Sequence, residues 1–180
     1  MQHLQPIRAW LRQIWASYEE GADQAGGERP LRGYSALLAG YTGMCAAGGL
    51  AVRARGGAPE RPSAADLALL SVATFRLSRV LTKDAVAAPI RAPFTTYQGT
   101  GGPGEVMEAP RPGPTRHAVG ELVICPFCVS QWVGTAGLFA LALFPRTTRW
   151  AMSGLSAIAV ADALHFGYAR LQQAEEQAEG

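Results

Sequence analysis

The stretch GELVICPFCVSQWVGTAGLFALALFP, Gly120 to Pro145, joins a Cys-Pro-Phe-Cys motif to a long apolar run. Residues 122–144 contain no charged side chain. In a helix they reach roughly 34 Å, which is enough to cross a hydrocarbon core of about 30 Å. The stretch therefore predicts a membrane-spanning helix over 122–144, with the two cysteines at its start.

Residues 34–52 form a second block without charge, and in a helix they reach roughly 28 Å. Its glycines would weaken a helix in water, whereas in lipid the backbone must bond internally. Small side chains recur every four residues, a pattern that lets membrane helices approach closely: Ser35, Ala39, Gly43, Ala47 and Ala51. The block predicts a second membrane-spanning helix.

Residues 64–82 and 150–168 supply two further apolar blocks. The first ends in a basic face, so it either spans the membrane with that face at the cytoplasmic headgroups or lies flat in the interface. We expect a short or tilted span. The last block repeats small residues at Ser153, Ala157 and Ala161. Because only about six residues separate it from 122–144, these two blocks predict an antiparallel helical hairpin.

The remaining segments are polar: an N-terminal arm over 1–33, a connector over 84–119 and a tail over 171–180. In the arm, apolar residues at three- and four-residue steps predict a short amphipathic helix: Leu4, Ile7, Leu11, Ile14 and Trp15. Such a helix either lies on a membrane surface or packs against its own protein. The connector is rich in Gly and Pro and predicts a mobile segment without strands.

The sequence thus predicts an all-α integral membrane bundle over 34–170, with four transmembrane helices or three plus one interfacial helix. Nine Lys and Arg residues flank the predicted spans on the side of the termini and the connector, against five on the other side. This bias predicts a cytoplasmic-membrane protein with both termini in the cytoplasm. Four basic residues near the connector are expected to contact anionic lipid or a protein partner: Arg76, Arg79, Lys83 and Arg91.

Cys125 and Cys128 are the main candidates for chemistry. Pro126 suits the first position of a helix, which makes Cys125 the cap and places Cys128 in the first turn. A helix N-terminus favours a thiolate, so the pair can act as a redox dithiol with Glu121 as proton acceptor. It can also be half of a zinc site completed by His117 and His165, or a plain packing element.

Asp162 and His165 share one face of the last predicted span. Ionisable groups inside a span are costly, and they mark either helix packing or a proton pathway. One interpretation pairs Asp162 with Arg76 or Arg79 and lets His165 reach the interface. The other is a proton or ion relay.

The overall composition excludes several functions. A net charge of +2, without an aromatic-interleaved basic stripe, gives no basis for a nucleic-acid partner. No catalytic motif stands out, and GTGGPG lacks the Gly-Lys-Ser/Thr of a phosphate-binding loop. We therefore expect no enzymatic activity and no cofactor other than zinc.

Five segments resemble, in order, a known family: ERPLRGYSALLAGY, DLALLSVATFRLSRVLTKD, PIRAPFTTYQG, GELVICPFCVSQWVGTA and ALFPRTTRWAMSGLSAIAVADALHFGYA. They are similar to the bacterial domain of unknown function 1360 family over about residues 29–170. The resemblance implies a small bacterial membrane protein with a Cys-Pro-aromatic-Cys motif, and some relatives carry a sporulation label. It implies no activity.

Three functions follow as hypotheses. The first is a membrane scaffold that recruits a protein partner or assembles with copies of itself. The second is a membrane dithiol or metal-binding protein using Cys125 and Cys128. The third is a small proton-coupled transporter using Asp162 and His165.

Overall fold

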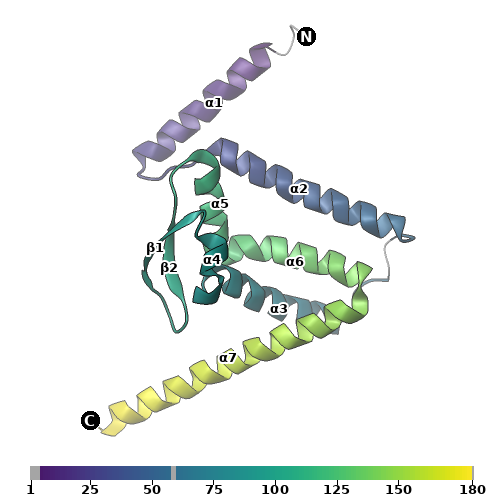
Figure 1. Cartoon of the computed structure of the whole chain (residues 1–180), viewed down its shortest axis with the longest axis vertical. Helices are drawn as coiled ribbons and strands as arrows, with labels where there is room; N and C mark the ends of the chain where they lie inside the picture. Colours follow the sequence, from purple (N-terminus) through teal and green to yellow (C-terminus); the bar gives the residue numbers. More distant parts are fainter. Residues whose placement is uncertain (1–4, 58–59, 180) are drawn as a thin grey trace.

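The computed structural model describes residues 5–57 and 60–179, which form a mostly helical chain with one small sheet (Figure 1). The helical character predicted from the sequence is confirmed. The elements in order are α1 (Gln5–Gln24), α2 (Leu31–Ala54), α3 (Ala64–Thr82), the 3-10 helix η2 (Ala85–Ala87), α4 (Ala88–Arg91), β1 (Thr95–Thr100), β2 (Val106–Pro110), α5 (Pro114–Ile124), α6 (Pro126–Leu143) and α7 (Pro145–Glu179).

Helix α3 lies at the centre of the bundle and packs against both α6 and α7, while α2 packs against α5 and α6. Figure 1 shows α2, α6 and α3 extending in roughly the same direction, with α7 crossing below them. Helices α4 and α5 and the hairpin gather at one end, which we call the connector end. The opposite end, formed by residues 55–57, residues 60–63 and the α6–α7 turn, is the loop end.

The buried apolar core is small. Ala73, Leu141 and Met152 form a cluster with half-buried leucines of α3 and α7 around it. Many large apolar side chains on the same helices instead face outward, including Leu38 and Leu50 on α2, Phe75 on α3 and Leu164 on α7. The helices therefore meet along narrow seams and leave broad apolar faces uncovered.

Glycines set the distance between helices along these seams. A Cβ at Gly48 would lie 2.5 Å from the Phe139 ring, and one at Gly137 would lie 2.6 Å from Leu70. The α2–α6 seam also contains Tyr41, whose ring meets Trp132 edge-on at 5.3 Å between centroids. Tyr41 further bonds the Thr135 hydroxyl at 2.8 Å. Close backbone approach and side-chain hydrogen bonds are the contacts by which helices associate in lipid.

The small-residue stripes predicted from the sequence do not form these seams. Ser35, Ala39, Gly43 and Ala47 are exposed on the outer face of α2, as are Ser153, Ala157 and Ala161 on α7. The packed face of α2 instead contains half-buried residues such as Tyr41, Met44 and Gly48. The four-residue spacing of small residues therefore did not predict which face of α2 packs against α6. That face is the one on which Tyr41 forms its hydrogen bonds.

The predicted span over 122–144 is broken at Cys125, because residues 122–124 belong to α5 and α6 begins at Pro126. Cys125 has an extended backbone (φ −103°, ψ 106°) and caps α6. Pro126 occupies the first turn, as expected of a residue without an N–H. The apolar run therefore bends sharply at the cysteine motif, and only the part after it forms the long helix.

The connector was expected to be mobile and free of strands, and the structure corrects this expectation. Strands β1 and β2 pair antiparallel from Thr95↔Pro110 to Thr100↔Val106, with an irregularity between Tyr97 and Gly99. Gly104 adopts φ +74°, which the turn between the strands requires. Gly101, Gly102 and Gly104, which suggested mobility, lie in the turn between the two strands. Glycine is common in such turns.

Helix α1 has an uncovered apolar face. Ile7, Trp10, Leu11, Ile14 and Tyr18 are all exposed, so the interpretation that this helix packs on its own protein is wrong. Leu4 of the predicted pattern lies outside the described residues. A hydrogen bond from the Leu31 amide to Glu19 at 2.8 Å joins α1 to the start of α2.

Within the described ranges, α2 and α6 are long and apolar enough to cross a membrane. Helices α3 and α7, which contain the blocks 64–82 and 150–168, do not meet the same measure. Polar residues explain this result, since α3 contains Asp66, Arg76 and Arg79, and Asp162 and His165 interrupt the apolar block of α7.

Replacing Gly48 by Leu should lower the free energy of unfolding by about 1–3 kcal/mol, because the new side chain would collide with the Phe139 ring. The matched control is Gly43→Leu on the same helix, where a Cβ meets no atom within 4 Å. Denaturant unfolding in detergent measures both variants. Equal stability of the two would contradict the packing of α2 on α6.

Candidate functional site: the charged cap at the connector end

A buried ion pair organises the connector end. Arg91 has only 1% of its side chain exposed, and its Nε donates to Glu108 on β2, whose side chain is 6% exposed. The Arg91 Nη1 donates to the carbonyl oxygens of Leu81 at 3.0 Å and Asp84 at 3.1 Å. Thr95 donates from its hydroxyl to the Arg91 carbonyl at 3.0 Å. One residue thus joins the end of α3, helix α4 and both strands.

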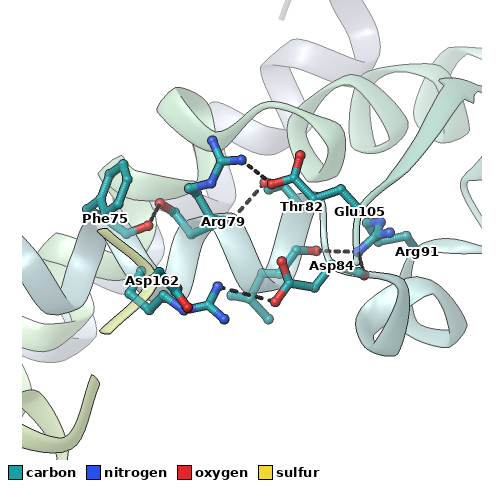
Figure 2. A network of polar contacts seen from close by, with 10 residues as sticks. Phe75, Arg79, Thr82, Asp84, Arg91, Glu105 and Asp162 are labelled. Atoms are coloured by element: carbon teal, nitrogen blue, oxygen red, sulfur yellow. Dashed lines mark hydrogen bonds and ion pairs between the residues drawn. The ribbon is translucent and has the colours of Figure 1, made fainter. Parts of the chain in front are cut away.

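Two arginines of α3 extend this network (Figure 2). Arg76 lies 3.2 Å from Asp84 through Nη1 and 2.9 Å from Asp162 of α7 through Nε. Arg79 pairs with Glu105, at the turn of the hairpin. Buried or half-buried arginines are stable only when each has an acidic partner. We call this set the charged cap: Arg76, Arg79, Asp84, Arg91, Glu105, Glu108 and Asp162.

The cap corrects one predicted role. Arg91 was expected to contact lipid or a partner, but a side chain buried against Glu108 reaches neither. Arg76 and Arg79 are each satisfied by carboxylates of this chain. Lys83 is half-buried beside them. The basic face is therefore largely neutralised internally. The sequence indicated Asp162 as one partner, but not Asp84, Glu105 and Glu108, which lie in the connector.

Asp162 and His165 are not brought together. Asp162 contacts Arg76, one of the two arginines that the sequence offered as its partner. His165 is exposed, and among the described residues no hydrogen bond or ion pair involves it.

Glu121 is occupied by partners other than the thiols. Its carboxylate accepts from Arg29 at 2.6 Å and from the Tyr34 hydroxyl, and His117 Nε2 lies 3.5 Å away. His117 Nδ1 in turn lies 3.0 Å from Glu28. These contacts tie the segment before α2 to α5. In the part of the chain that the structure describes, no hydrogen bond joins Glu121 to either cysteine.

The two thiols lie at the N-terminus of α6. Their Sγ atoms are 2.6 Å apart, and the Cys128 amide donates to the Cys125 sulfur at 3.3 Å. Cys128 is exposed, and Phe127 between the cysteines is 88% exposed. The pair is therefore accessible at the connector end, and its geometry allows thiol chemistry.

The predicted zinc ligands do not gather in one place. Over residues 5–57 and 60–179, no three His, Cys, Asp or Glu side chains lie close enough to hold a metal ion. His117 is engaged with Glu28 and Glu121, and His165 lies on the exposed second half of α7.

A separate ion pair lies at the loop end. Asp66 caps the start of α3 together with Ser63 and accepts two hydrogen bonds from Arg149, at 2.7 and 2.9 Å. The Asp66 carboxylate, through hydrogen bonding and its charge, raises the pKa of the Arg149 guanidinium above its ordinary value. This pair fixes the start of α7 against the start of α3.

Comparisons with known proteins place these features in a family. The family described as "Protein of unknown function (DUF1360)" matches residues 69–168, which include most of α3, the hairpin, Cys125 and Cys128, and the apolar part of α7. The chain belongs to this family, as the sequence motifs indicated.

One relative has a curated name. The chain is 30% identical over 100 residues to "Sporulation protein YjcA" of Bacillus subtilis (strain 168), a match that covers 51% of this chain and 85% of the relative. No solved structure matches the chain.

Three of the four acids of the cap were not predicted from the sequence. Asp84, Glu105 and Glu108 were assigned to a mobile connector. Their charge is opposite to that of Arg76, Arg79 and Arg91, and this was the feature of the sequence that could have suggested ion pairs. The segments that form the two strands, 95–100 and 106–110, are too short for an alternating pattern to predict strands.

Replacing Glu108 by Gln should lower the free energy of unfolding by about 3–5 kcal/mol, because it leaves the buried Arg91 charge without a partner. The matched control is Glu105→Gln, whose partner Arg79 is more exposed and whose loss should cost about 1 kcal/mol or less. Denaturant unfolding and protease cleavage within residues 95–110 measure both. An E108Q variant as stable as E105Q would contradict the buried pair.

Proposed function

We propose that this protein is an integral protein of the bacterial cytoplasmic membrane that acts as a non-enzymatic scaffold and presents its charged cap to a protein partner. The observation that carries the proposal is the combination of uncovered apolar helix faces with a polar, internally bonded cap. The accessible surface is 12532 Å². A water-soluble monomer of 19.0 kDa exposes only about 8,400 Å².

The distribution of charge supports a membrane location. Arginines flank the helices at the loop end and at the connector end, and the middle parts of α2 and α6 contain none. Helices α3 and α7 complete the proposed four-helix bundle, because each packs on α6 and places its own charged residues at an end. Ion pairs lower the cost of charges near the headgroups, as Asp162 does for Arg76.

The proposed orientation places the cap and both termini in the cytoplasm, following the excess of basic residues on that side. Six residues separate α1 from α2, so α1 must lie close to the membrane surface if α2 spans. Its uncovered Trp10, Leu11 and Ile14, with exposed Arg12 beside them, fit a helix lying in the interface.

The cap offers a surface suited to a partner. Ion pairs hold it rigid, while Val86 is 81% exposed and Ile90 68% exposed, four residues apart at the start of the connector. Exposed apolar side chains on a rigid support are typical of a docking surface. The relative's name makes sporulation the first process in which to look for the partner.

A second candidate function is favoured by the accessible cysteine pair. In a thiol–disulfide exchange, the Cys125 and Cys128 thiols would form a disulfide while a partner's disulfide is reduced to two thiols.

Membrane insertion and orientation can be tested together. The chain should stay in the membrane fraction after alkaline carbonate washing and dissolve only with detergent. In a background with all cysteines replaced by Ser, Arg146→Cys at the loop end should react with a membrane-impermeant maleimide in intact cells. The matched Ala174→Cys variant in the tail should react only after lysis. A chain released by carbonate would contradict the proposal.

One crosslinking experiment can distinguish partner recruitment from thiol chemistry. In-cell crosslinking of a tagged chain should yield a partner that is lost in the Val86→Asp/Ile90→Asp variant and kept in Cys125→Ser/Cys128→Ser. Leu38→Asn, on the outer face of α2, controls for general loss of apolar surface. Loss of the partner and of function only in the cysteine variant would favour the dithiol over the scaffold.

A further inference from the structure

A large pocket opens at the loop end, away from the charged cap. It has a volume of about 1190 Å³ and lies between α2 on one side and α3, α6 and the start of α7 on the other. Its walls are mostly apolar, with Val52, Leu138 and Phe139 among the lining residues. Pockets for drug-sized ligands have volumes of about 300–1,000 Å³, so this one fits a longer amphiphile.

Some charged residues of the pocket form an ion pair, and others do not. Asp66 and Arg149 neutralise each other through their two hydrogen bonds. Arg53 and Arg61 also line the pocket, with Glu60 as the remaining acid. Within residues 5–57 and 60–179, neither Arg53 nor Arg61 makes an ion pair or a side-chain hydrogen bond. The mouth of an apolar pocket thus has a surplus of one positive charge.

We propose that this pocket binds an anionic phospholipid, with an acyl chain along the α2–α6 wall and the phosphate held by Arg53 and Arg61. Guanidinium groups bind phosphate through paired, charge-assisted hydrogen bonds. Basic pockets between membrane helices are recognised sites for anionic headgroups. The inference rests on the proposed membrane location, because the membrane supplies this ligand.

The chemistry of the walls distinguishes a lipid from a soluble anion. Free phosphate would leave Leu138 and Phe139 facing water, whereas an acyl chain covers them. A zwitterionic lipid would fill the same walls and place an added positive charge beside the arginines. An anionic lipid covers the apolar walls with its acyl chain and neutralises the surplus positive charge with its phosphate.

The test uses the full chain purified in a neutral maltoside detergent, with lipid binding measured by native mass spectrometry and by the shift in melting temperature. Phosphatidylglycerol should bind at least about tenfold more tightly than phosphatidylcholine, and inorganic phosphate should give no shift. Equal binding of the two lipids, or an equal shift with phosphate, overturns the proposal.

Two pairs of variants locate the site. Arg53→Gln/Arg61→Gln should abolish the preference for phosphatidylglycerol, whereas Arg32→Gln/Arg116→Gln, with the same change of charge at the connector end, should keep it. Gly49 lines the pocket and has open space around its missing Cβ, so Gly49→Leu should weaken binding of both lipids. Gly43→Leu, outside the pocket, should not.

Unchanged preference in R53Q/R61Q, or equal effects of G49L and G43L, overturns the proposed site. Circular dichroism and gel filtration of each variant check that it remains folded. Failure of the lipid preference leaves membrane insertion untouched, because carbonate washing and maleimide labelling measure insertion independently of lipid class.

Discussion

The guanidinium of Arg91 is the constraint on which the connector end depends. A buried positive charge needs an acidic partner and hydrogen-bond acceptors, and Nε and Nη1 of Arg91 find theirs on three different elements: α3, the segment before η2 and strand β2. Nη2 has no hydrogen-bond partner among the described residues. Moving β2 would leave the buried charge without its acid, and moving either of the other two elements would remove an acceptor from Nη1. A segment rich in Gly and Pro is therefore held in one conformation by a single side chain, and the pairs Arg76–Asp84 and Arg79–Glu105 follow from the position it sets.

The bundle and the cap follow different physical rules. The cap pairs its charges internally, although Nη2 of the buried Arg91 has no hydrogen-bond partner within the described ranges. The helices make few buried apolar contacts and instead meet at glycines such as Gly48 and Gly137, with Tyr41 bonding across a seam. In water such a bundle would expose too much apolar surface, whereas in lipid that surface needs no cover. The change from one rule to the other occurs near the end of α3, where Arg76 meets Asp162 in the middle of α7.

The sequence predicted most of the helices, because apolar runs without charge have few alternatives. It also placed Cys125 as the cap of α6 and Pro126 in its first turn, since both follow from local backbone chemistry. The hairpin was missed because its stability comes from Glu108 reaching Arg91, a contact between residues seventeen apart that no local pattern records. The packed face of α2 was missed for a similar reason, since only the partner helix decides whether Tyr41 or Gly43 faces inward. Of the charged cap, the sequence found Arg76, Arg79, Arg91 and Asp162, and the fold supplied the other acids, Asp84, Glu105 and Glu108.

Helix α7 is a single rod of 35 residues. At 1.5 Å per residue it is about 52 Å long, against roughly 30 Å of hydrocarbon. If its first part spans the hydrocarbon core, about 20 Å of the rod must extend beyond that core. That distance exceeds the Debye length of about 8 Å at physiological salt. The acidic residues Glu175 and Glu176 are therefore shielded from the negative potential of the bilayer, and the end of the rod can meet a basic surface without competition from the lipids.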